Sequence, residues 1–120
     1  MHEFSVAAGI METVIDEAKK HDAKKVTKIV LELGPLSMIS TEQLKFALDI
    51  LAEGTMAEGA KTEYIDLPVK TECEKGHHGV VSTEKKDMMT IMTKLSCPVC
   101  GEKARAIGGR ECLIKEITAE

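Results

Sequence analysis

The sequence predicts an α+β fold: two helices packed on a three-stranded sheet, with a small cysteine-containing module inserted before the last strand. Three observations support this fold class. Two segments repeat apolar residues at helical spacing, three segments are β-branched or alternating, and one Cys-x-x-Cys pair lies in a stretch with little periodicity. With 120 residues, the chain has room for one core and an appendage but not for two full-sized domains.

The first helix is predicted over residues 5–21, and the second begins after Ser40 and ends at Gly54. In both segments apolar residues recur every three or four positions. Ser40 and Gln43 form a capping-box signature at the start of the second helix, and glycine is a common signal for a helix end. The apolar positions are Val6, Ile10, Met11, Val14, Ile15 and Ala18 in the first helix and Leu44, Ala47, Leu48 and Leu51 in the second.

Three strands are predicted over residues 25–33, 61–69 and 110–117. The first is rich in β-branched residues, and the other two alternate apolar with polar residues. Pro68 places the second strand near its end or at an edge, because proline donates no ladder hydrogen bond.

Residues 70–108 have little periodicity but hold three of the four cysteines. We therefore predict that residues 70–108 form a metal-stapled module, and that residues 1–69 plus 109–120 form an α/β domain around it.

The composition excludes several classes of partner. Sixteen basic residues against twenty acidic ones give a net charge of −4, whereas a nucleic-acid module normally presents a basic face. The chain has two Phe, one Tyr and no Trp, too few for base-stacking platforms. No apolar run reaches the roughly 18–20 residues that span a bilayer, and Glu3 stands where a secretory signal carries a basic residue. We expect a cytoplasmic protein with neither nucleic-acid nor membrane partners.

The segment Cys97-Pro98-Val99-Cys100-Gly101 has the form of a zinc knuckle. Two residues between thiolates let both sulfurs reach one tetrahedral ion, and the glycine permits the turn beneath it. Cys73 lies upstream at a separation typical of two-knuckle zinc ribbons and is the third predicted ligand. A redox dithiol is the alternative, but that motif opens a helix after a strand, so we favour a zinc-ribbon-like module.

The fourth zinc ligand is left open by the sequence, because Gly76 occupies the position three residues after Cys73. His77, His78 and Cys112 are the candidates, and we favour His77 since it lies nearest the expected position. Cys112 reads more simply as a small buried residue in a strand. A complete set of Cys73, His77, Cys97 and Cys100 leaves no open position for water, so the zinc is predicted to be structural and the chain is not expected to be an enzyme.

The N-terminal segment Met1-His2-Glu3 is a second candidate metal site. The terminal amine, the backbone nitrogen and imidazole of His2, and the amide nitrogen of Glu3 can form adjacent chelate rings on one cation. Such a planar set of nitrogens suits Ni(II) or Cu(II). Taken alone the motif is weak, since histidine near a terminus is more often an incidental polar residue.

Five segments together resemble the HypA/HybF family of hydrogenase-maturation nickel chaperones. They are residues 1–6, 31–37, 57–60, 97–101 and 109–117. The resemblance covers nearly the whole chain, and its specificity lies in combining an N-terminal Met-His-Glu with a late zinc module.

The resemblance implies that Ni²⁺ is a transferred cargo bound at Met1, His2 and Glu3. A HypB-type GTPase and the large subunit of a [NiFe] hydrogenase are the implied partners. Cys73, Cys97 and Cys100 match the family's zinc ligands. This chain departs from the family twice, with Gly76 in place of the usual second cysteine and with Ser40 where some members carry a carboxylate that helps the nickel site.

Two other classes of protein compete with this interpretation. A zinc-ribbon adaptor that binds protein without any nickel function would share the zinc module. A metalloenzyme would need an open metal position and a general base, and the isolated candidates Glu111 and His21 read as surface residues.

Overall fold

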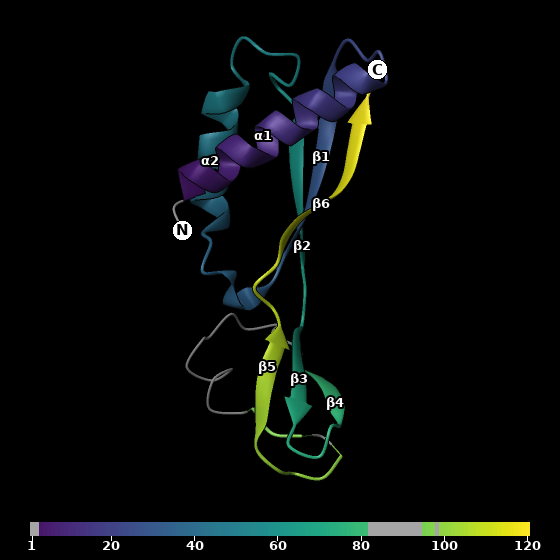
Figure 1. The fold of residues 1–120 in the computed structure, drawn as a ribbon. Coiled ribbons are helices and arrows are strands. Elements are labelled where there is room, and N and C mark those ends of the chain that lie inside the picture. Colours follow the sequence, from purple (N-terminus) through teal and green to yellow (C-terminus); the bar gives the residue numbers. More distant parts are fainter. Residues whose placement is uncertain (1–2, 82–94, 98) are drawn as a thin grey trace. The chain divides into compact units, whose positions relative to one another are not determined.

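A computed structural model describes residues 3–81, 95–97 and 99–120 of the chain. It contains two α-helices, a short 3-10 helix and six strands arranged as two three-stranded sheets (Figure 1). The elements are α1 (Glu3–Lys20), β1 (Val26–Leu33), η1 (Pro35–Ser37), α2 (Thr41–Ala52), β2 (Lys61–Asp66), β3 (Val69–Cys73), β4 (His78–Val81), β5 (Ala104–Gly108) and β6 (Cys112–Ala119). The predicted α+β class is confirmed. No helix in these residues is long and apolar enough to cross a membrane.

The chain divides into two compact units. The first unit comprises Met1–Leu31, Ile39–Ile65 and Leu113–Glu120. The second unit comprises Glu32–Met38 and Asp66–Cys112.

The sheet of the first unit has the strand order β2-β1-β6. Lys25 and Glu120 exchange backbone hydrogen bonds of 3.2 and 2.8 Å, so β6 runs antiparallel to β1. On the other side of β1, later residues of β1 contact later residues of the chain. The Val26 N–H donates to the Met56 carbonyl, and Lys28 Nζ forms a salt bridge of 3.2 Å with Glu63 Oε2. β1 and β2 are therefore parallel, and α2 forms the crossover that parallel neighbours require.

The helices bury the apolar faces that their sequences predict. α1 packs against α2. Its first residue lies two positions before the predicted start of the helix, and its last residue lies one position before the predicted end. The buried side chains are Ala7, Ile10, Met11, Val14 and Ala18 in α1 and Leu44, Ala47, Leu48 and Ala52 in α2. Continuous burial along one side explains why periodicity located both helices.

The start of α2 has one feature that the sequence does not predict. Ser40 Oγ accepts the Gln43 N–H at 3.3 Å, as the capping box requires. The reciprocal donor, the Ser40 N–H, bonds instead to Glu3 Oε1 at 3.2 Å. A side chain of α1 thus completes the cap of α2.

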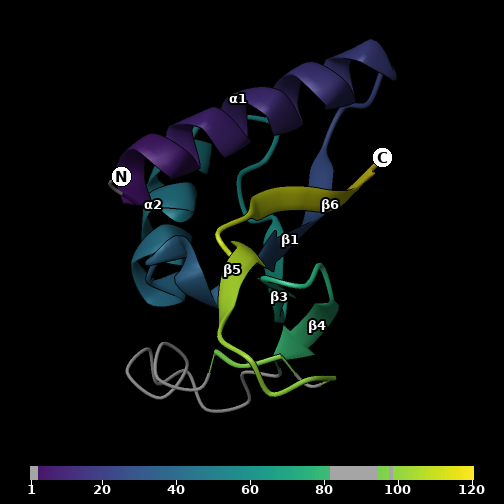
Figure 2. The ribbon, with the colours of Figure 1, turned by 60° about the horizontal axis from the view of Figure 1, so that its bottom comes forward.

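The second unit contains an antiparallel sheet of order β4-β3-β5, with β3 between its two neighbours (Figure 2). The strand predicted over residues 61–69 is present as β2 but is shorter than predicted. β2 ends at Asp66 and β3 begins at Val69, because Pro68 cannot continue the hydrogen-bond ladder. Three parts of the segment predicted to have little periodicity fold as short strands, namely β3, β4 and β5.

A close backbone approach joins two distant parts of the second unit. Gly34 donates its N–H to the Glu111 carbonyl at 2.8 Å, and Leu36 donates to the Gly109 carbonyl at 2.7 Å. Gly109 has φ +123°, and both carboxylate oxygens of Glu111 accept its N–H, at 3.0 and 2.9 Å. This bond lowers the pKa of Glu111, so the residue read as a surface acid is an anchor for its own loop.

Candidate metal centre

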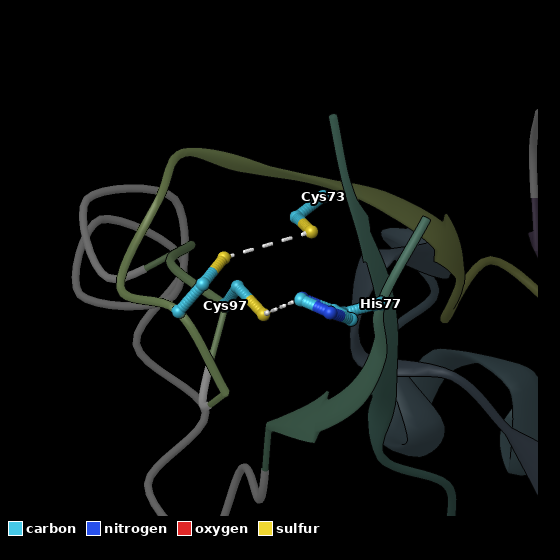
Figure 3. A group of neighbouring side chains, drawn as sticks. Cys73, His77 and Cys97 are labelled. Atoms are coloured by element: carbon cyan, nitrogen blue, oxygen red, sulfur yellow. Dashed lines mark hydrogen bonds between the residues drawn. The ribbon is translucent and has the colours of Figure 1, made fainter. Parts of the chain in front are cut away.

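Four potential metal ligands lie together in the second unit. Cys73 ends β3, His77 lies in the turn before β4, and Cys97 and Cys100 belong to the loop that precedes β5. One ligand atom from each residue lies within 4.8 Å of the other three. Figure 3 shows the labelled side chains of Cys73, His77 and Cys97 pointing toward a common centre.

Gly76 shapes the first half of the cluster. Its φ of +84° is a conformation that favours glycine, and its N–H donates to the Cys73 carbonyl at 3.0 Å. The Cys73 N–H in turn donates to the His77 carbonyl at 3.0 Å. This tight turn brings the His77 side chain back toward Cys73. Gly76, which occupies the position of the family's usual second cysteine, therefore shapes the turn, and His77 supplies the ligand atom.

The second half has the geometry of a knuckle. Gly101 has φ +72° and donates its N–H to the Cys97 carbonyl at 2.9 Å. The Val99 N–H points at Cys97 Sγ from 3.3 Å, and the Cys97 N–H donates to the Glu102 carbonyl at 2.8 Å. N–H groups aimed at a sulfur stabilise its thiolate form, which is the form that binds metal.

The electrostatics of Cys97 favour a metal-binding thiolate. Burial acts to raise the pKa of this thiol, but hydrogen bonds from the Cys100 and Val99 backbone and from the Cys100 and His77 side chains outweigh burial. The pKa of Cys97 is lowered from 9.0 to about 6. Cys97 Sγ lies 3.7 Å from His77 Nδ1, and Cys100 Sγ lies 3.8 Å from Cys73 Sγ. Three sulfurs and one imidazole nitrogen at these separations form a donor set suited to zinc.

The two other candidates for the fourth ligand lie outside this cluster. His78 is an exposed residue of β4, and its Nε2 lies 3.9 Å from Glu72 Oε2 on β3. Cys112 begins β6 and is half-buried, and burial raises the pKa of its thiol. The four residues predicted as zinc ligands are thus the four whose ligand atoms lie together.

The N-terminal candidate site falls partly outside the described residues, which exclude Met1 and His2. Glu3 is the first residue of α1 and is half-buried. Its carboxylate makes the bond to the Ser40 N–H described above.

The arrangement around His77 gives a testable ranking of the two histidines. Replacing His77 with alanine should weaken zinc binding at least tenfold, because one of four ligands is lost. His78→Ala, which changes a neighbouring imidazole outside the cluster, should change zinc affinity by less than about twofold. Competition with a zinc chelator measures both. Greater loss of zinc from His78→Ala than from His77→Ala would contradict the ranking.

Comparison with known proteins identifies the family. Residues 1–119 match the family model described as "Hydrogenase/urease nickel incorporation, metallochaperone, hypA". The chain belongs to the HypA family. It is 43% identical over 121 residues to the hydrogenase maturation factor HypA of Methanothermobacter thermautotrophicus, covering 100% of this chain and 98% of that relative. The HypA of Methanosarcina acetivorans is 41% identical over 128 residues, covering 100% of this chain and 96% of the relative.

Solved structures show the same fold at lower sequence identity. The solution structure of the nickel metallochaperone HypA from Helicobacter pylori has a TM-score of 0.70 and 20% identity, covering 99% of this chain and 97% of its own. A second HypA solution structure has a TM-score of 0.73 and 21% identity, covering 100% and 97%. The resemblance to HypA found in the sequence is confirmed, and it assigns the chain to nickel-incorporation metallochaperones of hydrogenase maturation.

Proposed function

We propose that this chain binds Ni(II) through Met1, His2 and Glu3 and delivers it, with a HypB-type GTPase, to the large subunit of a [NiFe] hydrogenase in the cytoplasm. The family match over residues 1–119 is the observation that carries this proposal. Relatives 41–43% identical over the full chain are named hydrogenase maturation factors. The chain's Met-His-Glu start supplies the nitrogen donors that a nickel carrier needs.

The zinc site has a separate, structural role in this proposal. Cys73, His77, Cys97 and Cys100 would hold Zn²⁺ with four protein ligands, leaving no position at which water could be activated. When bound, the ion cross-links the turn before β4 to the loop before β5. We therefore assign residues 70–108 to zinc binding, assign residues 1–69 plus 109–120 to nickel binding, and propose a carrier rather than an enzyme.

Nickel binding and release follow from the protonation of the N-terminal donors. An unperturbed terminal amine has a pKa of about 8 and an imidazole about 6.5, and both must lose a proton before they bind the ion. Nickel affinity should therefore rise with pH and fall as the solution is acidified through this range. Acid favours release of the cargo.

A direct test changes only the N-terminal donors. His2→Ala removes the imidazole, and a peptide extension before Met1 removes the terminal amine. Each change should weaken nickel binding at least a hundredfold while zinc content stays at one ion per chain, because the zinc ligands lie elsewhere. Calorimetric titration of the zinc-loaded, untagged protein with Ni²⁺ measures the affinity.

The outcomes separate the competing functions. A zinc-ribbon adaptor without nickel function would hold one zinc and bind no exchangeable nickel. Undiminished nickel binding by the extended protein would place the nickel site elsewhere in the chain.

A further inference from the structure

The carboxylate of Glu3 contacts an element far from it in the sequence. Glu3 Oε1 accepts the Ser40 N–H at 3.2 Å across a separation of 37 residues. Both residues are half-buried, and both belong to the first unit. The bond therefore fixes the first residue of α1 to the residue that caps α2.

The donor in this bond is one that a helix normally satisfies by itself. In a capping box the N–H of the cap residue bonds to the side chain at the third helical position, which is Gln43 here. Glu3 has taken this role, and it brings a negative charge to the partly positive start of a helix. Bonds between an ionised carboxylate and a backbone N–H are roughly twice as strong as neutral ones.

Covalent connection extends this anchor to the nickel donors. Glu3 directly follows His2, so holding its side chain restricts where the amine, the imidazole and the Glu3 amide nitrogen can lie. The first N–H groups of an α-helix have no intrahelical partner, so ligation by the Glu3 amide nitrogen would break no bond of α1.

We propose that the Glu3 carboxylate is a positioning group that fixes the first residue of α1, which directly follows the other nickel donors in the chain, to the start of α2, and that it does not coordinate nickel. This inference rests on the proposed function. It assigns Ser40 a role through its backbone N–H, at the position where some family members carry a carboxylate. It also makes nickel loading and the start of α2 energetically coupled.

The test compares variants that separate the hydrogen bond from other properties of the two residues. Ser40→Pro removes the N–H at a φ of −77°, which proline adopts, but it also removes the capping hydroxyl. Ser40→Ala removes only the hydroxyl and is its matched control. Glu3→Ala removes the carboxylate, whereas Glu3→Gln keeps an acceptor oxygen of similar reach.

We expect Glu3→Ala and Ser40→Pro each to weaken Ni²⁺ binding about 10- to 100-fold, the range of a hydrogen bond to a charged group. Ser40→Ala should lose less than about threefold, and Glu3→Gln should recover most of what Glu3→Ala loses. The double variant Glu3→Ala/Ser40→Pro should bind no more weakly than either single variant, because both remove the same bond. Calorimetry with Ni²⁺ on the zinc-loaded full chain gives these values.

Two spectroscopic readouts keep the test decisive if Ser40→Pro folds poorly. The absorption spectrum of bound Ni²⁺ should be the same in wild type and Glu3→Gln, since the coordinating atoms are unchanged. Hydrogen exchange of the Ser40 amide should slow on nickel loading in wild type but not in Glu3→Ala.

The proposal fails if Glu3→Gln alters the nickel spectrum and loses as much affinity as Glu3→Ala, because the carboxylate would then be a ligand. It also fails if Glu3→Ala binds nickel like wild type. In both cases wild type still binds nickel and depends on His2, so the proposed function stands. Absence of nickel binding by wild type would overturn the proposed function instead.

Discussion

Cys97→Ala is expected to release zinc from the protein and to unfold the second unit. Among the residues of this unit that the structure describes, the apolar clusters are small: one centres on Leu36 and Val69, and the other is Ala104 packed against the buried thiols of Cys73 and Cys97. Structural zinc contributes about 10–16 kcal/mol of binding free energy, which far exceeds what clusters of this size supply. The metal is therefore expected to be the main source of stability of this unit.

Zinc content and limited proteolysis measure this effect. The variant should contain less than a tenth of the wild-type zinc and should be cleaved within residues 70–108, while α1 and α2 keep their helical signal. Cys112→Ser is the matched control, because it removes a thiol outside the cluster and should retain one zinc per chain. Full zinc occupancy in Cys97→Ala would show that the ion binds elsewhere.

Gly34→Ala is expected to have the second large effect, a loss of about 3 kcal/mol or more in the free energy of unfolding. A Cβ at this position would overlap the carbonyl carbon and oxygen of Gly109 and lie 2.8 Å from its Cα. These are backbone atoms that no rotamer change can move. Relief requires the two segments to separate, which breaks the bonds from Gly34 to Glu111 and from Leu36 to Gly109.

Gly9→Ala is the control for this substitution and should have the opposite sign. Gly9 lies within α1, and a Cβ there meets nothing within 4 Å. Alanine should stabilise the helix by roughly 0.5–1 kcal/mol. Denaturant unfolding of both variants gives the comparison, and equal stability of Gly34→Ala and wild type would refute the packing argument.

The sequence predicted the first unit's elements well because their burial is periodic. α1 and α2 each bury one face along their length, and both were found. The strands of the second unit were missed because each has only four or five residues, too few for a clear alternation of apolar and polar residues.

The candidate metal centre was predictable in composition but not in geometry. Cysteine spacing selected Cys73, Cys97 and Cys100, and nearness to the expected fourth position favoured His77 over His78. The positive φ at Gly76, which forms the turn before His77, follows from no spacing rule. The bond between Glu3 and Ser40 was beyond sequence reasoning, since it joins two helices through tertiary packing.

The pairing of β6 with β1 also determines when the protein can fold during synthesis. Lys25 and Glu120 exchange hydrogen bonds across 95 residues (120 − 25), so β1 leaves the ribosome long before the strand that completes one side of its sheet. The hydrogen bond from the Gly34 N–H to the Glu111 carbonyl likewise cannot form until Glu111 has been synthesised. Contacts of such separation form late and slowly. The edge of β1 that pairs with β6 therefore has unpaired backbone groups in the nascent chain until residues 112–119 have been synthesised.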